Sequence, residues 1–259
     1  MPRVERASVT TIDRDGVDDA VRRLRAVAEQ CGVELTDRDD ADIAIVLGGD
    51  GTMLRALGRF RGTNVPAIGV NYGRVGFLTA IPADDLEDGL QRVFAGDYRT
   101  IELSTLEVTV HGETRTAVND VVVAGGTLGR MIEVGYAIGG EELGSQPCDG
   151  LICATPAGST AYNLSNGGPV LVWGLDAMVL TFVAPHALHI RPLVVPRGPD
   201  VVVTNLTSDQ ATGVLVNGQQ IATLGHGEQA VVRVGAQPSL LATLPEVTFF
   251  SRYAANFGG

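Results

Sequence analysis

A glycine-rich loop with a single carboxylate is the part of this sequence best suited to chemistry. Residues 48–52 read Gly-Gly-Asp-Gly-Thr and directly follow the apolar stretch Ile43–Leu47, which is typical of a buried strand. Glycines let a phosphate group approach the backbone closely, and a helix beginning near Thr52 would direct free N–H groups and its positive dipole end toward that phosphate. Asp50 would repel a polyanion unless it holds a metal ion or accepts a proton from an attacking hydroxyl. The loop therefore predicts phosphoryl transfer.

Two further polar segments interrupt apolar runs. Asn119 and Asp120 stand inside the apolar run 117–123, and residues 148–162 combine several hydroxyl groups with glycines and a proline. A polar loop between apolar strands fits recognition of sugar hydroxyls and base edges. Structural alternatives stay open, because Asn119-Asp120 could form a turn or bulge and Ser159-Thr160 could cap a helix over residues 161–164.

The composition narrows the chemistry that is available. The chain has 259 residues, of which 45% are hydrophobic and 19% charged, as expected for one large or two modest globular domains. A net charge of −11 argues against a nucleic-acid or membrane-surface partner. All 19 basic residues are arginine, which excludes mechanisms that depend on lysine, although genomic base composition also explains the missing lysine. Arginine, backbone N–H groups or a metal ion must therefore meet any anionic substrate.

The sequence predicts a cytoplasmic protein. Its first residues lack the pattern of a signal peptide, and no run approaches the ~20 apolar residues of a membrane-spanning helix. The three cysteines, Cys31, Cys148 and Cys153, are too few and too scattered for a disulfide framework or a zinc site. We therefore expect Cys148 and Cys153 to pack in the interior.

Residues 1–100 alternate between helix and strand patterns. This alternation predicts an α/β domain, Rossmann-like with a parallel sheet. The expected helices and strands are a helix over 17–31 ended by Gly32, strands over 41–47 and 65–71, and helices over 52–60 and 84–94.

Short β-branched runs separated by Gly, Asn, Asp and Pro dominate residues 101–239. They predict an all-β, sandwich-like domain. The last stretch, residues 240–259, is richer in aromatic residues, and we expect it to pack back on the first domain. The expected strands of the second domain cover residues 103–110, 116–123, 133–138, 179–183, 201–204, 213–216 and 230–234.

Taken together, these motifs resemble the NAD kinase family over residues 41–233. The GGDGT loop alone is moderately specific, because lipid kinases and phosphofructokinases use similar loops, whereas the long segment that begins at Asp149 is specific. The resemblance is carried by GGDGT at Gly48, NYGRVGFL at Asn71, the pair at Asn119, DGLICATPAGSTAYNLSNGGP from Asp149 and PHALHIRPLVVP from Pro185.

The resemblance implies a two-domain kinase that makes NADP. It implies transfer of the terminal phosphoryl group of ATP, or of inorganic polyphosphate, to NAD, with a divalent metal ion, for which we expect Mg²⁺. It also implies a homodimer or homotetramer in which Asp149 reaches the nicotinamide end of NAD on a neighbouring subunit. No metal ligand is assigned from the sequence.

The residue types and the resemblance together predict roles within the site. Asp50 is the expected base that deprotonates the 2′-hydroxyl of the adenosine ribose, and Arg74, in a glycine-rich loop after a strand, is either a bidentate phosphate ligand or a surface or interdomain ion pair. Asn119 suits the adenine edge, Asp120 the ribose hydroxyls, and Tyr162 a flat contact. The expected phosphate cradle is Gly48, Gly49, Gly51 and Thr52. The expected NAD-binding residues are Asp50, Gly51, Asn119, Asp120, Asp149, Ser159, Thr160, Ala161, Tyr162 and Ser165.

The sequence departs from the family pattern at two places, and it leaves two alternative functions open. Ala157 stands where the family usually has Thr or Ser, and Asn217-Gly218 stands where it often has Asp-Gly, although Asn-Gly still suits a tight hairpin turn. A related kinase of a lipid or sugar phosphate is disfavoured by the loop 149–166. A dinucleotide-binding sensor without catalysis is disfavoured by Asp50.

Overall fold

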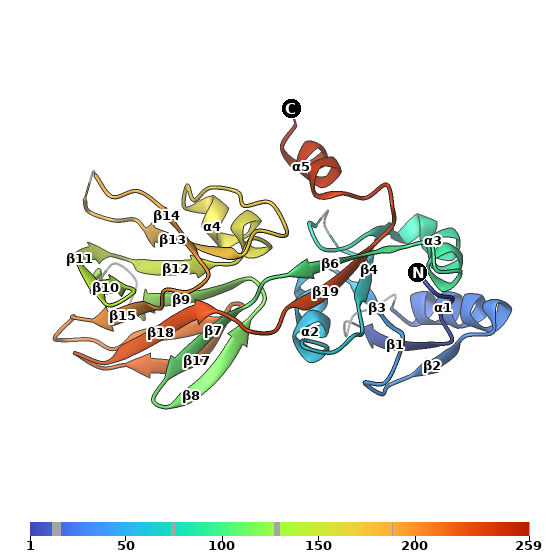
Figure 1. Cartoon of the computed structure of the whole chain (residues 1–259), viewed down its shortest axis with the longest axis horizontal. Coiled ribbons are helices and arrows are strands. Elements are labelled where there is room, and N and C mark those ends of the chain that lie inside the picture. The colour runs from blue at the N-terminus through green and yellow to red at the C-terminus, as the bar shows by residue number, and fades with distance from the viewer. Residues whose placement is uncertain (12–16, 74–75, 127–129, 188, 259) are drawn as a thin grey trace. The chain divides into compact units, whose positions relative to one another are not determined.

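The chain divides into two compact units. The computed structural model describes residues 1–11, 17–73, 76–126, 130–187 and 189–258. Unit 1 comprises Met1–Glu102 and Ser239–Gly259, and unit 2 comprises Leu103–Pro238 (Figure 1). No helix formed by the described residues is long and apolar enough to cross a membrane.

Unit 1 is built on a seven-stranded sheet with the strand order β2-β1-β3-β4-β19-β6, and β5 pairs with β4. The pairs β1–β2, β1–β3, β3–β4, β4–β5 and β4–β19 are all parallel, which confirms the predicted α/β architecture. The strand β19 follows unit 2 in the sequence and is inserted beside β4. The bounds are β1 (Arg6–Thr11), β2 (Glu34–Thr36), β3 (Ile43–Gly48), β4 (Ala67–Asn71), β5 (Ile81–Pro82), β6 (Arg99–Leu103) and β19 (Ser239–Thr243).

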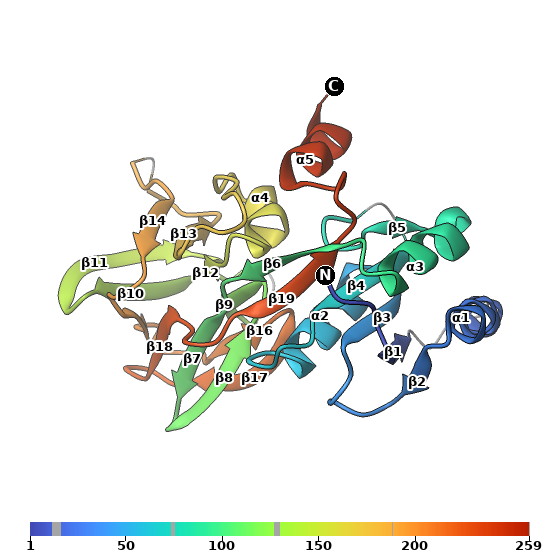
Figure 2. The same cartoon turned by 45° about the vertical axis from the view of Figure 1, so that its right-hand side comes forward.

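Helices cover both faces of this sheet. Ile43, Ile45 and Leu47 of β3 share a core with α1 and α3, which lie side by side in Figures 1 and 2. The alternate residues point the other way, and a side chain at Gly69 of β4 would collide with Met53 of α2. The helices are α1 (Val17–Cys31), α2 (Asp50–Arg59), the 3₁₀ turn η1 (Ala83–Asp85), α3 (Leu86–Phe94) and α5 (Phe249–Phe257).

The predicted helices of unit 1 are present, with shifted starts. Residues 17–31 form α1 as expected, and Gly32 ends it with a φ of 69°. The helix expected from Thr52 begins at Asp50, so the carboxylate belongs to the first helical turn. The helix expected over 84–94 opens with a 3₁₀ turn.

Unit 2 is a sandwich of two six-stranded sheets whose strand pairs are antiparallel, as predicted. One sheet has the order β11-β10-β15-β18-β7-β8 and the other β14-β13-β12-β9-β16-β17. The bounds are β7 (Leu106–Val110), β8 (Glu113–Ala117), β9 (Asp120–Gly125), β10 (Ile132–Ile138), β11 (Glu141–Cys148), β12 (Gly150–Ala154), β13 (Ala177–Val183), β14 (Leu193–Pro196), β15 (Val201–Asn205), β16 (Thr212–Val216), β17 (Gln219–Leu224) and β18 (Gln229–Val234).

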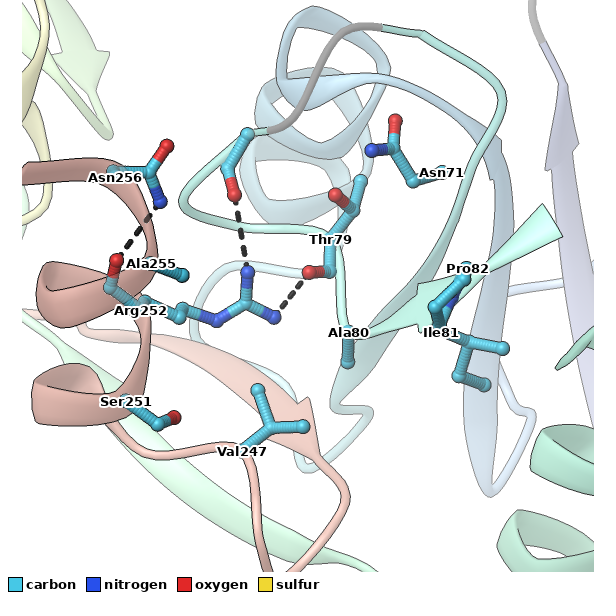
Figure 3. Close-up of a pocket in the computed structure, with 11 residues that line it drawn as sticks. Asn71, Thr79, Ala80, Ile81, Pro82, Val247, Ser251, Arg252, Ala255 and Asn256 are labelled. Carbon is cyan, nitrogen blue, oxygen red and sulfur yellow. Dashed lines mark hydrogen bonds between the residues drawn. The ribbon is translucent and has the colours of Figure 1, made fainter.

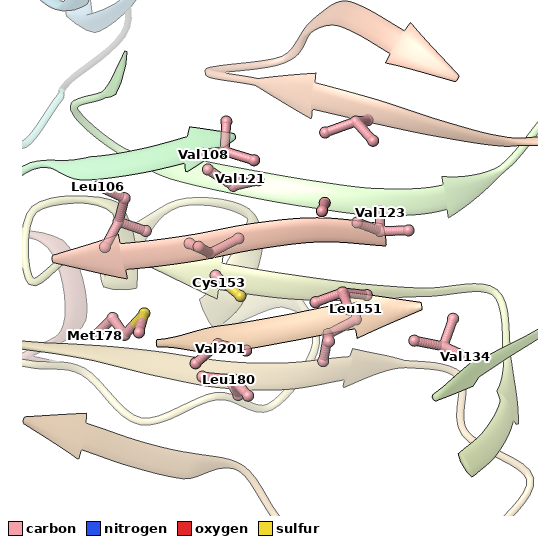
Figure 4. Packing of buried hydrophobic residues seen from close by; sticks show 14 of the residues in the cluster. Leu106, Val108, Val121, Val123, Val134, Leu151, Cys153, Met178, Leu180 and Val201 are labelled. Carbon is pink, nitrogen blue, oxygen red and sulfur yellow. The ribbon is translucent and has the colours of Figure 1, made fainter. Parts of the chain in front are cut away.

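The inner faces of both sheets form one aliphatic core (Figure 4). Val108 of β7, Val121 of β9 and Leu180 of β13 belong to it. Cys148 and Cys153 are free and buried in the same core, which confirms their predicted packing role. Burial raises the pKa of these thiols to about 11 and about 12, respectively.

Two sequence-based expectations for unit 2 are wrong. The run 116–123 is not one strand, because the strand is interrupted at Asn119. The two parts of the run, β8 and β9, belong to different sheets. The polar loop expected over 148–162 contains the strand β12, which is buried on both faces. A strand buried on both faces reads as a continuous apolar run rather than an alternation, so it shows no strand period in the sequence.

Candidate functional site

The glycine loop joins the buried end of β3 to α2. The N–H groups of Thr52 and Met53 bond to the carbonyl of Gly49, and no side chain caps the helix. Among the described residues, a Cβ atom at Gly49 or Gly51 would meet nothing within 4 Å. Packing of the described residues therefore does not require glycine at these two positions, and space remains for a ligand against the backbone.

Gly48 and Thr52 serve the packing of this turn. A Cβ atom at Gly48 would lie 2.5 Å from the Thr52 hydroxyl oxygen, and the Thr52 residue is only 3% exposed. Its N–H group already bonds to Gly49. Among the predicted cradle residues, Gly49 and Gly51 thus present open backbone, whereas Gly48 and Thr52 fix its shape. Arg74, the predicted phosphate ligand, lies outside the described residues.

Two backbone amides hold the Asp50 carboxylate. The N–H of Phe77 donates to Oδ2 at 2.7 Å, and the N–H of Leu78 donates to Oδ1 at 3.0 Å. The approach of this segment is so close that a Cβ atom at Gly76 would lie 2.2 Å from Oδ1. Each carboxylate oxygen can accept a second hydrogen bond, so the carboxylate is fixed in direction and can still receive a hydroxyl proton.

In unit 2, Asn119 lies between β8 and β9, and hydrogen bonds to its backbone hold it in place. The side-chain oxygen of Asn217 accepts hydrogen bonds from the N–H groups of Val118 at 3.1 Å and Asn119 at 2.8 Å. The Asn119 carbonyl accepts from the N–H of Thr155, and a Cβ atom at Gly158 would lie 2.1 Å from it. The side-chain oxygen of Asn119 is buried without a partner among the described residues. Its hydrogen-bonding capacity is therefore unused by the described residues.

Asp120 is the first residue of β9 and is buried. It is only 6% exposed, and no hydrogen bond from the described residues reaches its carboxylate. Burial raises its pKa to about 6. A largely buried carboxylate without a hydrogen-bond donor from the described residues is suited to receive donors from a ligand.

The segment after β12 lies against the Asn119 carbonyl. It forms the 3₁₀ turn η2 (Gly158–Thr160) and the short helix α4 (Tyr162–Ser165). The buried Ser159 hydroxyl donates to the carbonyl of Pro156 and accepts from the N–H of Leu171. Ala161 is the N-cap residue of α4 and makes no side-chain bond, so the helix-capping alternative for Ser159 and Thr160 is wrong.

The remaining predicted NAD-binding residues are partly or fully exposed. Thr160 bonds the Ala157 carbonyl through its hydroxyl, and Tyr162 is 46% exposed. Ser165 and Asp149 are exposed, and Ala161 is half-buried. The structure thus brings Asn119 and Asp120 together with residues 155–160, while Asp149 presents its side chain to the surroundings.

Sequence reasoning missed two residues that hold these segments in place. Asn163 is fully buried, donates to the carbonyls of Ser159 and Pro169, and accepts from the hydroxyl of Thr181 at 2.6 Å. Arg252 of α5 bonds the segment that holds Asp50. Asn163 stands in a polar run that gives no signal of its burial, and the one signal available in the sequence was the arginine within the aromatic run 247–257.

Comparisons with known proteins bear on both units. The model of the ATP-NAD kinase N-terminal domain matches residues 8–98, and that of the ATP-NAD kinase C-terminal domain matches residues 118–244. The NAD kinase of Gemmatimonas aurantiaca is 40% identical over 233 residues, which cover 88% of this chain and 81% of that protein. The chain belongs to the NAD kinase family. The NAD kinase of Heliobacterium modesticaldum is 42% identical over 234 residues, with 88% and 83% coverage.

Solved structures of this family share the fold. An NAD kinase from Archaeoglobus fulgidus, in complex with ATP, has a TM-score of 0.80 and 26% identity and covers 98% of this chain and 97% of its own. Yeast NADH kinase, complexed with NADH, has a TM-score of 0.85 over 100% of this chain and 89% of its own. Its sequence identity is 20%, so the likeness to the yeast protein concerns the fold alone.

Proposed function

We propose that this protein is an NAD kinase, transferring the terminal phosphoryl group of ATP to the 2′-hydroxyl of the adenosine ribose of NAD. Membership of the family supports the reaction. The observation that carries it is the Asp50 carboxylate, which two backbone amides hold at the start of α2. Beside it, Gly49 and Gly51 leave their backbone open to a phosphate group.

In the proposed reaction, Asp50 accepts the proton of the ribose 2′-hydroxyl. The oxygen then forms a bond to the terminal phosphorus of ATP while the bond from that phosphorus to the bridging oxygen breaks, and ADP leaves. A base of this kind contributes roughly 10²–10⁴-fold to the rate. In-line positioning and charge neutralisation at the helix N-terminus supply the larger share.

The residues present fit a phosphate-bound Mg²⁺. The described residues form no group of three or more His, Cys, Asp or Glu side chains that could hold a metal ion. Mg²⁺ needs only one or two carboxylates when phosphates and water complete its shell, and Asp50 is a carboxylate within the phosphate loop. When bound, the metal ion would neutralise charge on the phosphates.

NAD recognition is assigned to unit 2. The unpaired side-chain oxygen of Asn119 suits the exocyclic amine of adenine, and the unpartnered carboxylate of Asp120 suits two ribose hydroxyls. Residues 159–162 and Ser165 would line the dinucleotide. Asp149 would reach NAD bound to a neighbouring subunit of a homodimer or homotetramer, which its exposure allows. Use of polyphosphate as donor and a cytoplasmic location stay predictions.

A matrix of phosphoryl donors and acceptors tests the function. Purified protein is incubated with ATP or polyphosphate, with NAD or NADH, and with Mg²⁺ present or chelated, and formation of the 2′-phosphorylated dinucleotide is measured by a coupled assay. We expect turnover with ATP and NAD, lost on chelation. Measured NAD affinity without any product would instead indicate a sensor, and phosphorylation of a lipid or sugar phosphate would indicate the related kinase.

A further inference from the structure

A buried arginine from α5 bonds the segment that holds the Asp50 carboxylate. Arg252 is 8% exposed, and its guanidinium donates to the backbone carbonyls of Gly76, at 3.1 Å, and Thr79 (Figure 3). Between these carbonyls lie the two N–H groups that donate to Asp50. Residues 76–79 therefore bond the carboxylate through their amides and the guanidinium through their carbonyls.

The start of α5 is fixed in its own right. The hydroxyl of Thr248 accepts from the N–H of Ser251, and the hydroxyl of Ser251 accepts from the N–H of Thr248, which completes a capping box one residue before Arg252. The ring of Phe77 stacks on Phe257 with ring centroids 5.5 Å apart. The arginine thus projects from a rigid helix onto a segment that the same helix also packs against.

Simple packing does not account for a charge at this position. Burial lowers the pKa of Arg252 to about 10, and the negative charge of Asp50 opposes that fall, so the guanidinium stays charged at neutral pH. Its Nε has no hydrogen-bond partner among the described residues. It lines a pocket of about 330 Å³ together with Asn71 and Asn256. An apolar side chain of similar volume would avoid this desolvation, which points to a role for the charge and its two donors.

We propose that Arg252 is a positioning residue for phosphoryl transfer. By bonding the carbonyls of Gly76 and Thr79, it fixes the two amides that set the direction of the Asp50 carboxylate. The remaining acceptor sites of that carboxylate then face the reacting hydroxyl in one orientation. This role rests on the proposed function of Asp50 as the base.

Turnover kinetics of Arg252→Met and Arg252→Lys test the role. We expect Arg252→Met to lower kcat about 10- to 100-fold, because misplacing a catalytic group by ~1 Å has an effect of this size. The KM values for NAD and ATP should stay within about threefold. Arg252→Lys keeps the charge but cannot span two carbonyls, so its kcat should lie between those of Arg252→Met and the parent protein. If Arg252→Met does not fold, as judged by circular dichroism, Arg252→Lys alone decides by its loss of kcat.

A double-mutant cycle separates this role from a general loss of stability. In an Asp50→Asn background, Arg252→Met should cause less than about a twofold further loss, because the group that it positions is gone. Asn256→Ala is the matched control, since Asn256 lines the same pocket from the same helix, and its one hydrogen bond among the described residues goes to the backbone carbonyl of Arg252 and not to the guanidinium. It should keep parental kcat.

Three results would overturn the role. The first is a kcat within about threefold of the parent protein in both Arg252 variants. The second is that Arg252→Met lowers kcat as much in the Asp50→Asn background as in the parent protein, and the third is that Asn256→Ala lowers kcat as much as Arg252→Met does. Failure of the base assignment has a different signature, because Asp50→Asn alone would then keep its turnover.

Discussion

Asp50 and Asp120, the two carboxylates of the proposed site, lie in opposite environments. In unit 1, both oxygens of Asp50 accept backbone hydrogen bonds, and a buried guanidinium bonds the segment that supplies them. In unit 2, the carboxylate of Asp120 is buried with no such bond from the described residues, and burial alone raises its pKa to about 6. The described residues thus supply hydrogen-bond donors to the carboxylate of Asp50 but none to that of Asp120.

The difference indicates two roles for one chemical group. A base must keep its direction while the substrate changes, so its partners are supplied by the fold. A residue that recognises sugar hydroxyls must exchange water for substrate, so its partners arrive with the ligand. If substitution of Asp50 and of Asp120 has the same effect on turnover and on NAD affinity, this difference in roles is wrong.

The largest expected effect is on turnover by Asp50→Asn. We expect kcat to fall at least ~100-fold, with NAD affinity within about threefold, because the amide cannot take the proton. Its NH₂ group would also face one of the two backbone N–H donors. Steady-state kinetics and calorimetric titration with NAD measure both quantities. Near-parental turnover would remove Asp50 from the base role.

The open backbone of the phosphate loop gives the next effect. Gly51→Ala should lower kcat/KM for ATP about tenfold by filling space that a phosphate needs, yet stabilise the helix by up to about 1 kcal/mol. Gly58→Ala is the matched control, since a Cβ atom at Gly58 of the same helix also meets nothing within 4 Å. Equal kinetics for the two variants would contradict the phosphate assignment.

Asp120→Asn should separate binding from stability. We expect NAD affinity to fall about tenfold, because two charge-assisted hydrogen bonds weaken. At pH 7 the free energy of unfolding should rise by about 1–2 kcal/mol, because the buried charge is removed while a buried amide remains. Calorimetry and urea unfolding measure the two changes. A loss of kcat at unchanged NAD affinity would reverse the roles of Asp50 and Asp120.

The raised pKa of Asp120 also predicts a pH dependence. The folded protein binds the carboxyl proton of Asp120 more tightly than the unfolded chain does. The protonated carboxyl group therefore contributes to the free energy of unfolding below pH 3.8, and this contribution is lost as the pH rises to about 6. Across this pH window the parent protein should therefore lose on the order of 3 kcal/mol of its free energy of unfolding relative to Asp120→Asn. A difference that stays constant with pH would contradict the burial of the carboxylate.

The smallest effect concerns the brace on Asn119. Asn217→Asp keeps an oxygen that accepts from the Val118 and Asn119 amides, so KM for NAD should change less than about threefold. Asn217→Ala leaves both amides unpaired and should raise that KM more than the aspartate does. Identical KM values in the two variants would show that these hydrogen bonds do not position the adenine site.

The sequence predicted what local patterns determine. The face of α1, the apolar run of β3 and the Asn217-Gly218 hairpin, with φ values of 48° and 79°, each depend on neighbouring residues. The sequence suggested a turn or bulge at Asn119 but not that β8 and β9 join different sheets, and it missed the strand β12, because the partners of these strands lie far away in the sequence.

For the proposed site too, the sequence predicted the contiguous residues but not the contacts between distant segments. The glycine loop is contiguous, so its residues could be assigned from spacing alone. The bonds from residues 77 and 78 to Asp50, and from Arg252 to residues 76 and 79, join segments that are distant in the chain. No periodicity encodes such contacts, and only the unusual arginine among aromatic residues hinted at them.

The insertion of β19 beside β4 has a consequence for biosynthesis. Unit 2 is a continuous segment and can fold as soon as it leaves the ribosome, whereas the sheet of unit 1 lacks an internal strand until residues 239–243 emerge. At 5–20 residues per second, the first hundred residues wait on the order of ten seconds for that strand. During this interval β5 pairs with the end of β4, but the part of β4 around Ala67 that later pairs with β19 is an open sheet edge, where chaperones could bind.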